Sequence, residues 1–146
     1  MNRRSIASIL VTLLGLATVG VGCNGDETKA SYVDDANAIC ARVVDQFPDR
    51  SAIQPGGPAA DEAFRELATA RGNAIRELRR LEPPADDAAT AAKMLRQLGK
   101  SQRLLEEAQR LGESEMVLPT LIAAAHEDDE AHAAARSLGL EGCARL

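Results

Sequence analysis

The sequence predicts an all-α protein: an antiparallel up-and-down four-helix bundle, tied by a disulfide bond and preceded by a cleaved signal peptide. In four separate segments, apolar residues recur every three or four positions, which is the period of an amphipathic helix. Proline- and glycine-containing turns separate these segments. The chain is rich in alanine and only 2% aromatic, a composition that favours closely packed helices over sheets.

The N-terminus has the pattern of a secretory signal. Arg3 and Arg4 supply positive charge, and an apolar run follows from Ile6 to Val21. That run is shorter than the roughly 20 residues needed to cross a bilayer as a helix. We therefore expect residues 1–22 to be a signal peptide.

The end of this signal, Val19-Gly20-Val21-Gly22-Cys23, resembles the lipobox of bacterial lipoproteins, although that family usually has leucine where this chain has Gly20. The resemblance implies that Cys23 carries lipid and becomes the first residue after cleavage. Two acyl chains hold a protein stably on a bilayer, whereas one does not. The alternatives are a plain signal peptide that leaves a free thiol, and a retained membrane helix.

The expected organisation is a signal peptide over 1–22, a flexible tether over 23–30 and a helical domain over 31–146. The tether is expected because Asn24 to Lys29 are polar and lack periodicity. Removing the signal takes away two arginines and moves the net charge from −5 to −7. An acidic domain with few aromatic residues argues against binding nucleic acid.

Helices are expected over about 31–47, 59–81, 86–111 and 115–138. Pro48 and the Pro83-Pro84 pair end the first two, and Gly139 provides the left-handed residue after the fourth. Gly99 weakens the third helix by up to about 1 kcal/mol relative to alanine. The apolar stripe of the fourth helix is expected to comprise Val117, Leu118, Leu121, Ala124, Ala125, Ala131, Ala135 and Leu138.

If Cys23 is acylated, Cys40 and Cys143 remain as a pair in an oxidising compartment. We predict a Cys40–Cys143 disulfide, the alternative being two buried thiols. Cys40 lies midway along the first helix, so the segment after Gly139 must fold back to reach it.

Three fragments, Tyr32 to Val43, Leu81-Glu82-Pro83-Pro84-Ala85-Asp86 and Leu138-Gly139-Leu140-Glu141-Gly142-Cys143, together resemble small helical lipoproteins of actinobacterial type. The resemblance spans nearly all of the chain after the signal. It implies an extracytoplasmic helical bundle with its two cysteines paired, and it implies no particular activity.

The polar segment most relevant to chemistry is His126 to His132. Metal-ligand candidates within it are His126, Asp129, Glu130 and His132, since imidazole and carboxylate groups bind zinc or copper. His126 and His132 are six residues apart and point about 120° from each other on a helix, so one ion could not easily take both. We therefore expect no metal and no cofactor, and interpret the segment as a solvated acidic face.

Two further polar features have two readings each. Asp128 falls where the apolar stripe should continue, either at its edge or facing a partner, a polar core group or a water. Arg76, Arg79 and Arg80 form a basic patch at the end of the second helix. That patch either contacts an anionic lipid or polymer, or matches the helix dipole and pairs with Glu77 and Glu82.

No nucleophile elbow or phosphate-binding loop occurs in the sequence, so an enzyme is not expected. The leading interpretation is a monomeric, non-enzymatic, lipid-anchored envelope protein on the outer face of the cell membrane, which acts as an interaction or scaffold module for another envelope protein. The alternative is an extracytoplasmic module that binds a small ligand or a metal.

Overall fold

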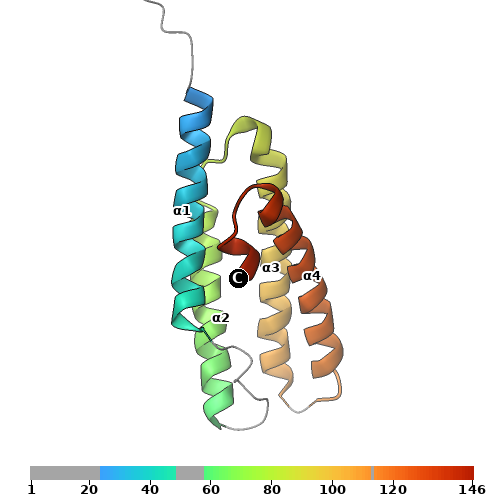
Figure 1. Ribbon diagram of the computed structural model, residues 1–146. Coiled ribbons are helices and arrows are strands. Elements are labelled where there is room, and N and C mark those ends of the chain that lie inside the picture. Colours follow the sequence, from blue (N-terminus) through green and yellow to red (C-terminus); the bar gives the residue numbers. More distant parts are fainter. Residues whose placement is uncertain (1–23, 49–57, 113) are drawn as a thin grey trace, which may run out of the picture.

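The computed structural model describes residues 24–48, 58–112 and 114–146. These residues contain four long helices: α1 (Asn24–Gln46), α2 (Pro58–Leu78), α3 (Ala88–Leu111) and α4 (Val117–Ser137). Two short 3₁₀ helices, η2 (Ala85–Asp87) and η3 (Cys143–Arg145), complete the described chain, in which no strand occurs. The all-α class is as predicted, and successive long helices run in opposite directions along the molecule (Figure 1).

Helix α1 begins at Asn24 rather than near Ser31, so the expected flexible tether is helical over Asn24 to Ala30. The Nζ of Lys29 lies 2.9 Å from a carboxylate oxygen of Asp87 in η2. This ion pair anchors the early part of α1 to the rest of the bundle.

Helix α2 ends at Leu78, three residues before the expected position, and hydrogen-bonded turns follow at Arg80 and Leu81. Pro83 has no backbone N–H and its ring would clash with the carbonyl of Arg79, four residues earlier, so the regular helix ends directly before Arg79. The chain then re-enters helical geometry through η2, directly before α3.

Helix α4 ends in a Schellman motif, in which Gly139 is the left-handed residue that the sequence predicted. Gly139 has a φ of +77°, which is the left-handed conformation. Its N–H donates to the carbonyl of Arg136 at 3.1 Å, and the N–H of Leu140 donates to that of Ala135 at 2.9 Å. The motif reverses the chain and sends Leu140 into the core, where it is fully buried.

The C-terminal segment closes the bundle between α1 and α4. Within the described residues, the backbones of α1 and α4 make no direct contact, whereas η3 packs against both (Figure 1). Leu140, Cys143 and Leu146 are all buried in the same core as the long helices. The segment therefore takes the place of direct α1–α4 packing.

A disulfide bond joins Cys40 on α1 to Cys143 in η3, with Cα atoms 5.0 Å apart. The predicted pairing is confirmed, and so is the returning C-terminal segment that brings the two residues together. Both cysteines are fully buried.

The rest of the core comes from aliphatic side chains of all four helices. Met94 and Leu98 on α3 are its largest fully buried apolar side chains, and burying each contributes about 1.5–3 kcal/mol. Ala124, Ala131 and Ala135 of α4 are also buried. Small residues let α4 lie close to α3, and these two helices form the most extensive packing in the molecule.

Candidate functional site

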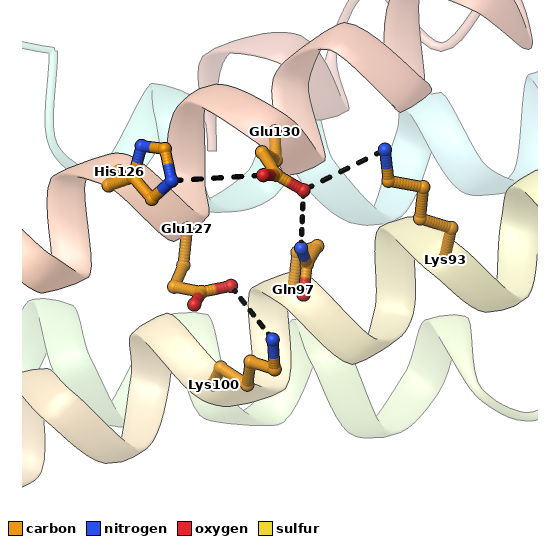
Figure 2. Close-up of polar contacts among 6 residues, drawn as sticks. All are labelled: Lys93, Gln97, Lys100, His126, Glu127 and Glu130. Atoms are coloured by element: carbon orange, nitrogen blue, oxygen red, sulfur yellow. Dashed lines mark hydrogen bonds and ion pairs between the residues drawn. The ribbon is translucent and has the colours of Figure 1, made fainter.

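The histidine-bearing segment lies on α4 beside α3, where polar side chains of the two helices point toward one another (Figure 2). His126 and Glu130 are one turn apart, and the His126 Nε2 is 3.7 Å from the Glu130 Oε1. The side chain of His126 is 73% exposed. This pair is the one part of the metal hypothesis that the structure brings together.

Glu130 is the centre of these contacts. Its Oε2 accepts a hydrogen bond from the Gln97 amide nitrogen at 2.5 Å and lies 3.7 Å from the Lys93 Nζ (Figure 2). The Gln97 amide, followed by the Lys93 ammonium group, lowers the pKa of Glu130. The carboxylate is therefore held ionised and turned toward α3.

A second bridge, between Lys100 on α3 and Glu127 on α4, spans 3.4 Å (Figure 2). Exposed pairs of this kind contribute about 0–1 kcal/mol each. The Lys100–Glu127 pair and the contacts of Glu130 therefore add little stability, and their main effect is to set the register between α3 and α4.

His132 does not join His126. Its ring is partly buried, and its Nε2 has no hydrogen-bond partner. Burial lowers the pKa of His132, opposed in part by the nearby Asp128 carboxylate. Asp129 is exposed, and the described parts of the chain contain no group of three or more His, Cys, Asp or Glu side chains placed to hold a metal.

Beneath this face lies a buried polar residue that the sequence analysis did not single out. Arg71 on α2 is only 2% exposed. It forms an ion pair with Asp128 on α4, and its Nη1 donates to the Ser101 hydroxyl on α3 at 3.1 Å. Burial lowers the pKa of Arg71, and Asp128 opposes that effect. Of the two readings of Asp128, the structure selects the polar core group.

The signal for this arrangement was present in the sequence. Arg71, Ser101 and Asp128 each stand where the apolar stripe of their own helix should continue. An isolated interruption is usually a residue at the edge of a stripe. Here three helices each carry one polar residue in their apolar stripe, and two of these residues have opposite charges. Such residues can pair with one another in the core.

We call Arg71, Ser101 and Asp128 the Arg71 network; a separate polar side chain on α3, Gln102, also contacts α2. The amide nitrogen of Gln102 donates to the Ala68 carbonyl and to Glu106, both at 2.9 Å. The Arg71 Nε and the Gln102 Oε1 are buried without hydrogen-bond partners. Asp128 on α4 matches the charge of Arg71 on α2, and Ser101 on α3 accepts a hydrogen bond from it. The Arg71 network therefore links α2, α3 and α4 through directed contacts.

A groove of about 580 Å³ runs between α1 and α2. Its floor is apolar, with Ile39, Val43 and Ala74, and charged side chains stand along its rim. Two of its rim contacts are ion pairs, Arg42 with Glu77 and Arg65 with Glu62.

The start of α4 exposes large apolar side chains. Met116, Leu118 and Ile122 are 57%, 66% and 62% exposed, and we call these three the α4 apolar patch. The expectation that Leu118 belongs to the buried stripe was wrong. Leu118 and Ile122 are one turn apart and share an exposed face of α4.

The expected lipidation residue, Cys23, and the expected signal peptide over 1–22 lie outside the described residues. No helix in the described part of the chain is both long enough and apolar enough to cross a membrane. No protein-family model, curated protein or solved structure matches this chain.

Proposed function

We propose that this protein is a monomeric, non-enzymatic, lipid-anchored protein of the cell envelope that presents a helical surface to another envelope protein. The proposed location rests on the sequence, which has a basic start, a short apolar run and a lipobox-like ending at Cys23. A disulfide between Cys40 and Cys143 supports it, because such bonds persist in oxidising compartments outside the cytoplasm.

The observation that carries the interaction role is the α4 apolar patch. It lies at the end of the molecule opposite to the start of α1 (Figure 1). A chain tethered through its N-terminus would hold this patch away from the lipid surface. The patch is thus placed to meet a partner protein with an apolar surface of its own, rather than the bilayer to which the chain is anchored.

The anchor is tested by labelling with radioactive palmitate. The wild-type chain should incorporate label and remain with the membrane, whereas Cys23→Ser should do neither. A Cys40→Ser/Cys143→Ser variant is the control, since it loses other cysteines and keeps the lipidation residue. Label that persists in Cys23→Ser would contradict the proposed anchor.

The interaction role is tested by chemical cross-linking on intact cells. Leu118→Glu should abolish a discrete cross-linked species, and Ala133→Glu should leave it intact. Ala133 is the matched control because it is exposed on the same helix, outside the patch. A species equally abundant in both variants would remove the patch from the interaction. A product of twice the chain's own mass would identify a second copy and contradict the monomer.

A second candidate is a module that binds a small ligand, favoured by the α1–α2 groove with its apolar floor and charged rim. Native mass spectrometry of the purified chain should then show a bound small molecule. Ala70→Phe would fill the groove and should abolish binding of the small molecule, whereas Ala133→Phe should leave binding unchanged.

A further inference from the structure

Two arginine side chains meet over Gly99 in the middle of α3, one from Arg79 directly after α2 and one from Arg103 on α3 itself. The Nη2 of Arg79 is 2.7 Å, and the Nη1 of Arg103 is 3.8 Å, from the position that a Cβ atom at Gly99 would occupy. A side chain at this position would displace the Arg79 guanidinium group. Glycine therefore lets that group lie directly on the helix backbone.

Other basic residues surround this point. Arg96 precedes Gly99 by three residues, which places it on the same face of α3. Arg76 lies in the last turn of α2, three residues before Arg79, and its Nη1 is 3.9 Å from the Cβ position of a second glycine, Gly72. We call Arg76, Arg79, Arg96 and Arg103 the arginine cluster.

Within the described part of the chain, no carboxylate lies within ion-pair distance of this cluster. No ion pair joins any of its four members to an acidic residue among the described residues. Glu77, which the sequence offered as a partner for the α2 arginines, is instead paired with Arg42 toward α1. Arg76 has one polar side-chain partner, the amide oxygen of Asn73. The nearest acidic residues further along α3, Glu106 and Glu107, form no ion pair with Arg103.

An unneutralised group of like charges is unusual on a chain whose net charge is −5. Guanidinium groups that lie close together repel one another unless an anion stands between them. Their planar, forked donors match the oxygens of phosphate, and two forks can hold one tetrahedral oxyanion. A singly charged carboxylate would leave most of this positive charge uncompensated.

We propose that the arginine cluster is a binding site for a phosphate-bearing anion, with Arg79 and Arg103 as its two principal ligands. This site lies on the α2–α3 face and is separate from the α4 apolar patch. The proposal therefore goes beyond the proposed function and does not depend on it. Phosphate of this kind can come from an anionic lipid headgroup or from a soluble phosphorylated compound.

The test uses the purified full chain in a Cys23→Ser background, so that no lipid anchor contributes. Inorganic pyrophosphate is titrated by calorimetry, and co-sedimentation is measured with phosphatidylglycerol vesicles and with phosphatidylcholine vesicles. Arg79→Gln/Arg103→Gln should weaken binding by at least about tenfold, as expected for the loss of charge-assisted hydrogen bonds. Arg145→Gln is the control, since it removes an exposed arginine elsewhere and should change binding less than about twofold.

Gly99→Ala provides a second variant in which no charge is lost. The added methyl group would displace the end of the Arg79 side chain, so pyrophosphate affinity should fall while the protein stays folded, because alanine is a better helix former than glycine. This result would separate a loss of the site from a loss of folding.

The vesicle measurement distinguishes the two sources of phosphate. Cluster-dependent binding to phosphatidylglycerol but not phosphatidylcholine vesicles supports a lipid headgroup, and cluster-dependent binding to pyrophosphate alone supports a soluble compound. Failure to bind either probe, or equal losses in Arg145→Gln and the double variant, would overturn the proposal.

Discussion

The side-chain oxygen of Asn37 on α1 accepts a hydrogen bond from the backbone N–H of Gly142 at 2.8 Å, although the two residues are 105 positions apart. The same side chain donates through its nitrogen to the carbonyl of Gly139 at 3.4 Å. A Cβ atom at Gly142 would lie 3.0 Å from the backbone oxygen of Asn37. This close approach holds the C-terminal segment against α1 one turn before the disulfide.

Replacing Asn37 with alanine should therefore lower the free energy of unfolding by about 1–3 kcal/mol, because the buried Gly142 N–H loses its acceptor. Urea denaturation of the oxidised protein measures the change. Asn73→Ala is the matched control, since Asn73 is exposed and should cost less than about 0.5 kcal/mol. Equal losses in the two variants would show that Asn37 does not hold the segment.

Removing the disulfide should destabilise the protein more than removing the Asn37 contact. The bond spans 103 residues, and restricting so long a loop in the unfolded chain stabilises the native state by up to about 4.7 kcal/mol. Cys40→Ala/Cys143→Ala should lose about 2–4 kcal/mol in the same denaturation assay. Reductant should destabilise the wild-type chain and leave the variant unchanged. A variant as stable as the wild type would mean that packing of Leu140 and Leu146 alone holds the segment.

Removing one partner of the Arg71–Asp128 ion pair should lower the free energy of unfolding. Asp128→Ala leaves the Arg71 guanidinium buried with Ser101 as its hydrogen-bond partner, and we expect a loss of about 3 kcal/mol. Asp129→Ala, at an exposed neighbouring position, is the control. The double variant Arg71→Met/Asp128→Ala should recover part of that loss, because it no longer buries an unpaired charge. A double variant whose loss equals the sum of the two single losses would show that the residues are not coupled.

Stability should also depend on pH through His132. Burial lowers the folded-state pKa of His132 below its ordinary value of 6.5, so the unfolded chain binds the proton more readily. This contribution to stability is complete above about pH 6.5 and is lost as the pH falls through the lower folded-state pKa. Denaturation at several pH values should show the decline, and His132→Gln should reduce it.

His126→Gln is the control for that measurement, because the His126 side chain is exposed whereas the His132 ring is partly buried. This variant should leave the loss of stability at low pH unchanged. If His126→Gln and His132→Gln reduce the pH dependence of stability equally, the buried His132 ring is not the source of that dependence.

Much of the architecture could be predicted because it depends on local patterns. The four helices follow from apolar periodicity, and the turn after α4 follows from the conformational freedom of Gly139. The pairing of Cys40 with Cys143 follows from the count of cysteines left after the expected signal peptide. The early start of α1 was missed because its ion pair with Asp87 joins segments that the sequence alone does not bring together.

The polar interior was harder to predict because it depends on how the helices face one another. Periodicity shows that Asp128 interrupts a stripe, but it does not show that Arg71 and Ser101 interrupt theirs at the same level of the bundle. Leu118 was misassigned for the same reason. It fits a helical stripe in sequence, yet its side chain is 66% exposed in the folded chain.

The Cys40–Cys143 bond also determines how this molecule responds to cleavage and to force. A single peptide-bond cut anywhere between these two cysteines leaves both products covalently joined, so a nicked molecule keeps all of its parts in one place. Tension applied from outside the pair passes directly from α1 to η3 through the sulfur atoms. Helices α2, α3 and α4 are thereby spared from mechanical unravelling.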